Sequence, residues 1–589
     1  MAAVSSTYNQ FVSRTFNHGG YEMAKKNRVT LLAASLLTTS LMLSACGGNN
    51  NAGNEASQSA DSEATSTNTT NTNTTATNTS ADDKVDPFGK YDPPITVHSV
   101  RMALPDDRFE NGDTNENNVW TREYESALGI KLVYDWLGDP SGDSNKMDIS
   151  IASNDIPDAF GVNTKQMNQL VEGEQIQDLT EVWEKYASPA LKELGNQDGG
   201  LALKAATFDG KLMAIPKFGG NITSADILWI RTDWLDKLGL QPPKTMDELL
   251  KISEAFITKD PDGNGKNDTF GLAISKELSG LTGFYNGFHA YPGIWVKDDS
   301  GKLVNGNIAP EMKTALGKLQ ELYKAGYLDK EFAVKDGGKV IESISQNKVG
   351  IYFGANWYSY WPFNDARKQN PGMEWKPFPI VSADDKPAVP GVGFPVYEYY
   401  VAKDGFEHPE VIVKMLNLWL ERAYGETADW AKYSVSAKGT ELFQYPIFQV
   451  FAPNKDVPDN YLAVKEAVDS KDTSKLNPEQ KSLFEKITAF LNGDQEQWAT
   501  YRQAGPTESS FEVLAGYKDT LLTTGYLGAN TPTMVEKQGV LDKLQNETFT
   551  KIIMGAAPVD EFDKFVEQWK KLGGDQITTE VNEWFSKQQ

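Results

Sequence analysis

Side chains that carry oxygen recur along the segment 260–268. If Asp260 is counted as position 1, positions 1, 3, 5, 7 and 9 are Asp260, Asp262, Asn264, Lys266 and Asp268. A hard cation such as Ca²⁺ prefers oxygen ligands at this spacing, with the backbone carbonyl of the lysine as one of them, and the glycines in between permit a tight curl. The segment therefore predicts a structural calcium site.

A calcium loop of the full pattern has a bidentate Glu at position 12, where this chain has Gly271. A water molecule or a backbone oxygen would have to complete the coordination, at some cost in affinity. The alternative interpretation is a polar turn, rich in Asp and Gly, that joins a helix to a strand and binds no ion.

Large aromatic residues gather in two other segments. They are Tyr291 and Trp295 in the first segment, and Trp357, Tyr358 and Trp361 in the second. Sugar rings have an apolar C–H face that stacks on indole and phenol rings. The second segment follows a predicted strand directly, and an exposed loop seldom holds three large rings without a ligand or a partner. All five residues are candidates for substrate binding, and packing between lobes is the alternative.

Strands alternate with helices where the folded region begins. Strands are predicted over 95–103, 131–137 and 158–162, with helices over 120–128 and around Met147. This alternation indicates α/β units with parallel strands, in which ligands bind at the carboxyl ends of the strands.

Polar side chains follow two of these strands. Asp106 and Asn118 come after the first strand and Asn163 comes after the third, so they are candidate partners for sugar hydroxyl groups. The alternative for each is an ordinary polar residue at the surface. Arg101 either pairs with an acidic ligand or ends the first strand as a solvated charge.

Further elements continue the same pattern. Strands are predicted over 227–231 and 348–353, and helices over 233–238 and 411–421. Thr245 and Glu248 fit a capping box at the start of another helix. Near the end, one apolar helical stripe consists of Phe562, Phe565, Val566, Trp569 and Leu572.

The amino-terminal region reads as a secretion signal. Lys25, Lys26 and Arg28 follow Met23 and precede an uncharged stretch over 29–45, which is typical of a signal peptide and short for a membrane span. The stretch Leu-Ser-Ala-Cys that ends at Cys46 resembles the lipobox of bacterial lipoproteins, in which the cysteine is diacylated and becomes the mature amino terminus. The alternative is a cleaved signal with an incidental cysteine. Met23 is the better start, and the residues before it fit an upstream start assignment.

Residues 47–84 consist largely of Asn, Thr, Ser, Ala and Gly, a composition that predicts a disordered tether. A chain of 589 residues is longer than one hydrophobic core usually serves, so at least two lobes are expected. The net charge of -24 excludes a nucleic-acid partner, because nothing offsets the repulsion from phosphates.

Catalytic motifs are hard to find. The four histidines belong to no recognisable triad or metal motif, Cys46 is the single cysteine, and no nucleophile elbow or phosphate loop is present. A glycosidase needs only two carboxylates at the right separation, so a secreted carbohydrate-active enzyme remains the strongest alternative to a binding protein.

Several stretches together resemble one family, the extracellular solute-binding proteins of carbohydrate ABC importers. The resemblance is closest to the large lipoproteins of Gram-positive bacilli and to the alginate-oligosaccharide-binding proteins. Members of that family often have an acid at position 10 of the calcium loop, where this chain has Thr269. The stretches that carry the resemblance are 152–158, 208–216, 229–240, 244–249 and 569–584.

The resemblance implies an α/β protein with the type II periplasmic-binding-protein-like fold, in which two lobes discontinuous in sequence are joined by a hinge and close over ligand in a cleft. It implies an oligosaccharide ligand, ABC permease subunits as partners and a monomer held by its lipid at the extracellular face of the membrane. A surface adhesin or sensor on the same fold is a further alternative. The expected divisions are 1–45 signal peptide, 46–88 lipidated Cys and linker, 89–215 first lobe, 216–395 second lobe with the calcium segment, 396–465 return to the first lobe, and 466–589 carboxyl-terminal helices of the second lobe.

Overall fold

The computed structural model describes residues 85–588 except 139–144, 219–221, 394–395, 397, 437, 439, 451–455 and 529. The predicted signal peptide, Cys46 and the predicted tether lie outside the described residues. Within the described part of the chain, no helix has both the length and the apolar composition that a membrane span requires.

The buried apolar side chains of the described residues form three clusters, and their membership divides the chain into two lobes. The first lobe comprises residues 85–218 and 396–450, which share one cluster. The second lobe comprises residues 222–393 and 456–588, which share the other two. The chain thus leaves the first lobe once, returns to it, and leaves it again, as the expected discontinuous organisation requires.

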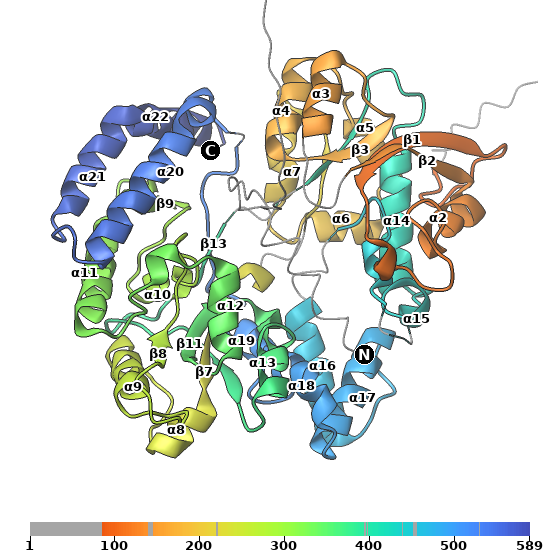
Figure 1. Ribbon diagram of the computed structural model, residues 1–589. Coiled ribbons are helices and arrows are strands. Elements are labelled where there is room, and N and C mark those ends of the chain that lie inside the picture. Colours follow the sequence, from red (N-terminus) through yellow and green to blue (C-terminus); the bar gives the residue numbers. More distant parts are fainter. Residues whose placement is uncertain are drawn as a thin grey trace, which may run out of the picture. The chain divides into compact units, whose positions relative to one another are not determined.

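The first lobe combines short strands with helices (Figure 1). Its strands are β1 (Ile95–Met102), β2 (Ile130–Gly138), β3 (Ala159–Val162), β4 (Thr207–Phe208), β5 (Lys211–Leu212), β6 (Ile215–Pro216) and β14 (Tyr399–Ala402). Its α-helices are α2 (Val119–Glu123), α3 (Asn145–Ser153), α4 (Thr164–Glu172), α5 (Thr180–Tyr186), α6 (Pro189–Gly195), α7 (Leu201–Ala205), α14 (Val411–Tyr424) and α15 (Trp430–Tyr433).

Strand pairing in the first lobe is partly parallel and partly antiparallel. β1 pairs with β2 in parallel, as the alternation of strands and helices predicts. β14 instead pairs antiparallel with both β3 and β6, because the chain enters this sheet again from the other direction after its excursion through the second lobe. The predicted all-parallel arrangement is therefore correct for the first pair and wrong for the returning strand.

The second lobe holds the larger share of the helices. Its strands are β7 (Ile227–Arg231), β8 (Phe270–Leu272), β9 (Trp295–Lys297), β10 (Leu303–Asn305), β11 (Val349–Gly354), β12 (Trp375–Phe378), β13 (Gly391–Val392) and β15 (Leu522–Thr523). Its first α-helices are α8 (Thr232–Leu238), α9 (Met246–Thr258), α10 (Thr282–Gly287), α11 (Pro310–Ala325), α12 (Gly337–Ser345) and α13 (Phe363–Gln369). The later ones are α16 (Asp456–Ser470), α17 (Pro478–Leu491), α18 (Trp498–Ala504), α19 (Ser510–Tyr517), α20 (Pro532–Ile553), α21 (Glu561–Trp569) and α22 (Asp575–Ser586).

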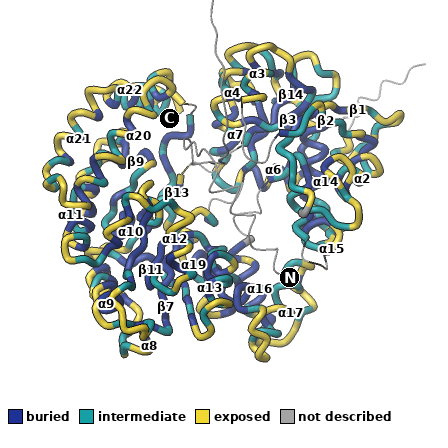
Figure 2. The backbone as a smooth tube through the Cα atoms, viewed as in Figure 1, coloured by how far each residue is buried: buried dark blue, intermediate teal, exposed yellow. Residues whose placement is uncertain are grey.

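A four-stranded sheet in the order β12-β7-β11-β8 forms the centre of the second lobe. β7 is antiparallel to β11 and β12, whereas β8 is parallel to β11. Leu228 and Ile230 point into one hydrophobic cluster and Ile227 and Trp229 into the other, as the two-residue period of a strand dictates. Figure 2 shows β7 and β11 dark blue throughout, so both faces of this sheet are covered.

Two expected boundaries require correction. Residues 456–465 were expected in the first lobe, but Val457, Tyr461 and Val464 of α16 are buried in a second-lobe cluster. Phe218 lies past the expected end of the first lobe and belongs to its cluster. Both differences follow from side-chain packing, which the sequence pattern does not reveal.

Two local predictions also change. Thr245 caps α9 by accepting a hydrogen bond from the Glu248 amide, but the Glu248 carboxylate accepts from the Lys244 amide, so the reciprocal bond of a capping box is missing. Leu572 is 44% exposed and leaves the predicted apolar stripe, because the helix becomes a π-helix over 570–574 with Gly573 at φ 137°.

Candidate functional site

The loop that follows β11 presents the aromatic residues of the second predicted segment. Trp357 and Tyr358 are half-buried, and their ring centroids lie 4.6 Å apart in an edge-to-face arrangement. Tyr358 also stacks on Tyr352 of β11, with the centroids 5.5 Å apart and the planes 25° from parallel. Gly354 allows this packing, because a Cβ atom there would lie 2.3 Å from the Tyr358 ring.

Hydrogen bonds from three directions hold the backbone of this loop. The side-chain amide of Asn356 donates to the carbonyl of Thr223, and Ser510 of α19 donates to the carbonyl of Asn356. The Trp229 indole N–H donates to the carbonyl of Ala355. A loop fixed in this way presents its aromatic rings in a defined orientation, which lowers the entropic cost of binding a ligand.

A half-buried carboxylate lies beside the rings of Tyr352 and Tyr358. The Asp226 carboxylate accepts a hydrogen bond from the Gly283 amide at 2.9 Å, and burial raises the pKa of Asp226 to about 6. Its negative charge adds to the burial that raises the pKa of Tyr352 to about 12, and it contributes in the same way at Tyr358 and Tyr517. One hydrogen-bond acceptor thus sits among aromatic rings, which is the pairing that a sugar requires.

Strand direction brings the acid and the rings together. Ile227 at the start of β7 pairs with Gly354 at the end of β11, since the two strands are antiparallel. Asp226 therefore lies at the same edge of the sheet as the loop that contains Trp357, although the two are far apart in the sequence. We call Asp226, Tyr352, Trp357 and Tyr358 the aromatic edge.

The remaining predicted aromatic residues lie elsewhere. Trp295 is 6% exposed, starts β9 and packs edge-on against Tyr526 in a hydrophobic cluster, so this candidate for substrate binding is a core residue. Tyr291 is half-buried next to Gly391, and burial raises its pKa. Trp361 is half-buried and directly precedes α13. None of the three has a contact among the described residues that ties it to the aromatic edge.

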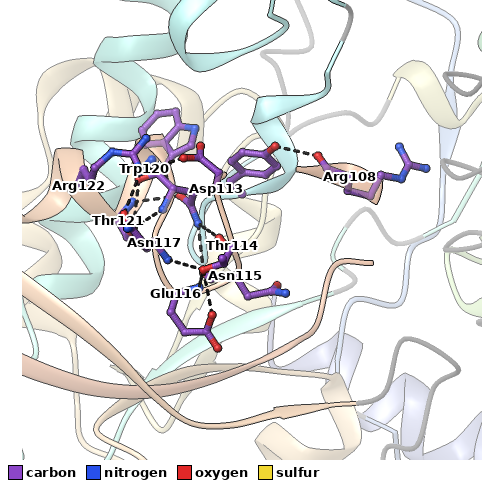
Figure 3. Close-up of polar contacts among 11 residues, drawn as sticks. Arg108, Asp113, Thr114, Asn115, Glu116, Asn117, Trp120, Thr121 and Arg122 are labelled. Atoms are coloured by element: carbon purple, nitrogen blue, oxygen red, sulfur yellow. Dashed lines mark hydrogen bonds and ion pairs between the residues drawn. The ribbon is translucent and has the colours of Figure 1, made fainter. Parts of the chain in front are cut away.

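The loop between β1 and α2 in the first lobe is held together by its own polar side chains (Figure 3). Asn118 is fully buried and caps α2, where its side-chain oxygen accepts from the amides of Trp120 and Thr121. Its amide group donates to the carbonyls of Thr114 and Asn115. All of these bonds are internal, so Asn118 is a structural residue and the prediction that it contacts a ligand is wrong.

The two other predicted polar partners differ from each other. Asn163 caps α4 by accepting from the Gln166 amide, and the Gln166 side chain accepts from the Asn163 amide in return. This capping box accounts for the position of Asn163 after β3 without a ligand. Asp106 is exposed at the start of a 3₁₀ turn over Asp106–Arg108 and stays a candidate.

Arg101 is neither solvated nor paired with an acid in the described residues. Its Nη1 and Nη2 atoms donate to the carbonyls of Tyr445 and Gln444 at 2.6 and 3.1 Å, and its Nε donates to the carbonyl of Met102. Arg108 lies near the same chain segment, because its Nη1 donates to Glu441 and its carbonyl accepts from the Tyr445 hydroxyl. Two cations therefore flank residues 441–445 in the first lobe.

The predicted calcium segment curls as its glycines suggest, with Gly263 and Gly265 both at φ 74°. The side-chain amide of Asn264 donates to the carboxylates of Asp262 and Asp268 at 2.7 and 3.0 Å, so these two carboxylates converge on one point. The Asp260 carboxylate accepts from the amides of Asn264 and Gly265. Burial and the neighbouring Asp260 raise the pKa of Asp262, whereas the hydrogen bond to Asp262 lowers that of Asp260.

Two positions of the calcium pattern are excluded as ligands by packing. A Cβ atom on Gly271 would lie 1.8 Å from the Ser253 hydroxyl of α9, so no acid fits at position 12. Thr269 is buried, and its hydroxyl donates to the carbonyl of Phe256. Among the described residues, no group of three or more His, Cys, Asp and Glu side chains is arranged to hold a metal ion. The donors present are nevertheless all oxygen atoms, which suits calcium.

The sequence interpretation missed three residues of these sites. Asp226 precedes a strand, whereas the predicted polar partners of a ligand follow strands. Tyr352 lies inside a strand that reads as core, and Arg108 has no motif around it. Sugars bind to carboxylates and aromatic rings, and this preference is the one signal that could have pointed to an acidic residue near an aromatic segment.

Comparisons with known proteins agree on a family. The family model described as bacterial extracellular solute-binding protein matches residues 112–426. The polygalacturonan/rhamnogalacturonan-binding protein YtcQ of Bacillus subtilis is 25% identical over 482 residues, which cover 79% of this chain and 87% of YtcQ. Lipoprotein LipO of the same organism is 31% identical over 238 residues, which cover 38% of this chain and 44% of LipO.

A solved structure has the same fold. It is the EF-hand mutant of the Streptococcus pneumoniae ABC-transporter substrate-binding protein FusA in complex with fructo-nystose. The two proteins have 17% sequence identity and a TM-score of 0.57, over 84% of this chain and 99% of that one. At this identity the likeness establishes the two-lobed fold of solute-binding proteins.

Proposed function

Because this chain belongs to the family of bacterial extracellular solute-binding proteins, we propose that it is the substrate-binding protein of an ABC importer and captures an oligosaccharide. The observation that carries the choice of ligand is the aromatic edge, where Trp357 and Tyr358 stand beside the acceptor Asp226. The printed names of YtcQ and FusA support the same class of ligand. The matched family consists of binding proteins, which favours capture over the glycosidase alternative.

Ligand capture by lobe closure is the proposed mechanism. A sugar that stacks on the aromatic edge of the second lobe and meets polar groups of the first lobe binds the closed state more tightly than the open state. That difference in affinity is what shifts the population toward closure. The closed form then has a surface that permease subunits distinguish from the open form.

A lipid at Cys46 is proposed to hold the protein at the extracellular face of the membrane. The residues before Cys46 support this proposal, as does the name of the relative LipO. Two acyl chains are enough for stable anchoring, and residues 47–84 would act as the tether. A Cys46→Ser variant expressed in the native host is expected in the culture medium instead of the membrane fraction.

Structural calcium is proposed at the segment 260–268. Asp260, Asp262, Asn264 and Asp268 would bind the ion through side-chain oxygens and Lys266 through its carbonyl. The ion would offset the repulsion between the carboxylates of Asp260 and Asp262. Lys237 already fixes the turn by donating to the carbonyl of Pro261 at 2.6 Å. The EF-hand in the name of the FusA structure supports the proposal.

Thermal unfolding with a panel of oligosaccharides tests the function. The chain from residue 46 onward, with Cys46→Ser, is heated with neutral and acidic oligosaccharides. A ligand in hundredfold excess over its Kd stabilises the folded state by about 2.7 kcal/mol, so its unfolding midpoint rises. Recovery of intact sugar supports capture, and cleaved sugar would establish the enzyme alternative. No shift with any glycan would favour an adhesin or sensor and contradict the proposal.

A further inference from the structure

The guanidinium group of Arg108 is largely buried, and at least three of its five N–H donors are unused. The side chain is 11% exposed, and one bond joins its Nη1 to Glu441 at 3.2 Å. Its Nε and Nη2 atoms are buried, and neither has a hydrogen-bond partner among the residues that the structure describes. Buried donors without partners are rare in folded proteins, because the lost hydration is not repaid, and a charged donor loses the most. Two such atoms on one side chain call for an absent acceptor.

The two unused atoms lie on the same edge of the guanidinium plane, where their N–H bonds point in the same direction. Arg231 of this chain shows what that edge binds. Its Nε and Nη2 donate to the two oxygens of the Asp233 carboxylate at 2.8 and 2.7 Å. The free edge of Arg108 thus has the geometry of a bidentate carboxylate site.

Three acidic residues close to Arg108, namely Glu441, Glu110 and Asp113, have hydrogen-bond or ion-pair partners other than its Nε and Nη2 atoms. The Glu441 carboxylate contacts Nη1 and also accepts from Gln444, and burial raises its pKa in spite of the arginine. Glu110 accepts from Thr440, and Asp113 is ion-paired with Arg122 at 2.9 Å. Figure 3 shows the guanidinium group of Arg108 turned away from the other labelled residues of this loop, Asp113 and Glu116 included.

A second arginine, Arg101, contacts the same chain segment as Arg108. Arg101 donates to the carbonyls of Gln444 and Tyr445, while Arg108 contacts Glu441 of the same short segment. No ion pair joins Arg101 to a carboxylate among the described residues. Arg101 and Arg108 thus bring two positive charges to the segment 441–445, where Glu441, Glu110 and Asp113 are the nearby carboxylates.

We infer that the free edge of Arg108 binds the carboxylate of an acidic sugar, so the ligand is an oligosaccharide that contains uronic acid. The inference rests on the proposed function and adds the charge of the ligand and the residue that selects it. A neutral sugar hydroxyl would satisfy one of the two donors, whereas a carboxylate satisfies both and offsets the positive charge.

Matched ligands and variants test the inference by isothermal titration calorimetry. The ligands are trimers of galacturonate, glucuronate and mannuronate, each beside its fully methyl-esterified form, which keeps the rings and linkages but removes the charge. The variants are Arg108→Met, Arg108→Lys and, as the control, Arg122→Met. Arg122 lies in the same part of the lobe, is 53% exposed and already has an acidic partner. Unfolding midpoints without ligand check that each variant folds.

The expected result is at least one uronate trimer that binds the unmodified protein about tenfold to hundredfold more tightly than its ester, the range for charge-assisted hydrogen bonds. Arg108→Met removes this preference and leaves the affinity for the ester unchanged. Arg108→Lys retains a charge without the fork and keeps only part of the preference. Arg122→Met changes neither affinity. Should the Met variant fail to fold, the Lys variant decides.

Three outcomes overturn the inference. If acid and ester bind equally well, or if Arg108→Met weakens both to the same extent, the arginine does not select a carboxylate. If neutral oligosaccharides alone bind, the proposed function stands and the inference is wrong. If no oligosaccharide of either kind binds, the proposed function and the inference fail together.

Discussion

The first lobe and the second lobe use their candidate binding residues in different ways. In the loop after β1, the amide side chains of Asn115 and Asn118 form hydrogen bonds with backbone groups, and Asp113 forms an ion pair with Arg122. In the aromatic edge, residues outside the site hold the backbone of the loop, and the Trp357 and Tyr358 rings are half-buried beside one another. In the first lobe the polar residues of the loop bond to one another and to the loop backbone. In the second lobe other elements hold the loop through hydrogen bonds.

This difference teaches which residues are candidates for function. A polar side chain whose hydrogen bonds are all internal contributes to folding, and its position near a strand end is no evidence of a ligand. A half-buried ring beside a carboxylate with a raised pKa suits a sugar. By this criterion the first lobe offers the Arg108 edge, and the second lobe offers the aromatic edge.

The largest expected effect concerns how the second lobe is stabilised. Free Ca²⁺ in hundredfold excess over its Kd adds about 2.7 kcal/mol, so EDTA is expected to lower the unfolding midpoint by about 5 to 10 °C. Scanning calorimetry measures the shift. Asp260→Ala should abolish the response to calcium, and Asp298→Ala should not, because Asp298 caps its turn with a single carboxylate that accepts from Ser300 and Lys302. An EDTA-insensitive midpoint would mean that the segment is a polar turn.

The next effect concerns the aromatic edge itself. Trp357→Ala removes the half-buried ring and is expected to weaken oligosaccharide binding by about 2 kcal/mol, or roughly thirtyfold, as at an interface hot spot. Titration calorimetry with any glycan that binds the unmodified protein measures the loss. Tyr360→Ala is the control, because Tyr360 lies in the same loop but bonds to Thr500 of α18. Equal losses for the two variants would remove Trp357 from the site.

Asp226→Asn should separate stability from affinity. The folded pKa of Asp226 is about 6, above its ordinary value of 3.8, so the folded protein disfavours the ionised form and loses stability as the pH rises from about 4 to about 6. The Asn variant escapes this loss and should unfold with a free energy higher by roughly 1 to 2 kcal/mol at pH 7.5. The difference should shrink at pH 4.5. Its affinity for sugar should fall, because an acceptor of hydroxyl groups is weakened.

Urea unfolding at the two pH values measures the first part of this prediction, and titration calorimetry measures the second. The Gly283 amide keeps its acceptor in the variant, so the helix contact is preserved. A variant that is less stable than the original protein at pH 7.5 would show that Asp226 is a structural residue, and the contrast between the two lobes would weaken.

The smallest effect tests the first lobe. Asn118→Ala removes a helix cap and should lower the free energy of unfolding by about 1 kcal/mol, measured by urea denaturation. Its affinity for oligosaccharide should stay unchanged. Asn117→Ala serves as the control, because the side chain of Asn117 contacts the exposed Arg122. A loss of affinity without a loss of stability would return Asn118 to the binding site.

Much of the local structure could be predicted from the sequence. The strand over 95–103 is β1, the helix over 120–128 ends at Gly129 in the left-handed conformation, and the curl at 260–268 forms at its glycines. Each of these depends on residues that are neighbours in the chain. The site was predicted less well, since Trp295 and Asn118 are internal, while Trp357 and Tyr358 stay predicted ligand contacts. Burial of a single ring or amide depends on residues that are distant in the sequence.

The sequence alone therefore determined the elements, the family resemblance, the oxygen-rich segment and the concentration of aromatic residues around Trp357. The tertiary structure decided which of these residues lie close together. Asp226 joins Trp357 because β7 runs antiparallel to β11, and no local pattern encodes the direction of a strand relative to its neighbour. Arg108 acquires its significance because Glu441, more than 300 positions away in the chain, occupies one nitrogen and leaves two. The hydrogen-bond partners of a side chain are its neighbours in space. Which donors have no partner can therefore be identified only from the tertiary structure.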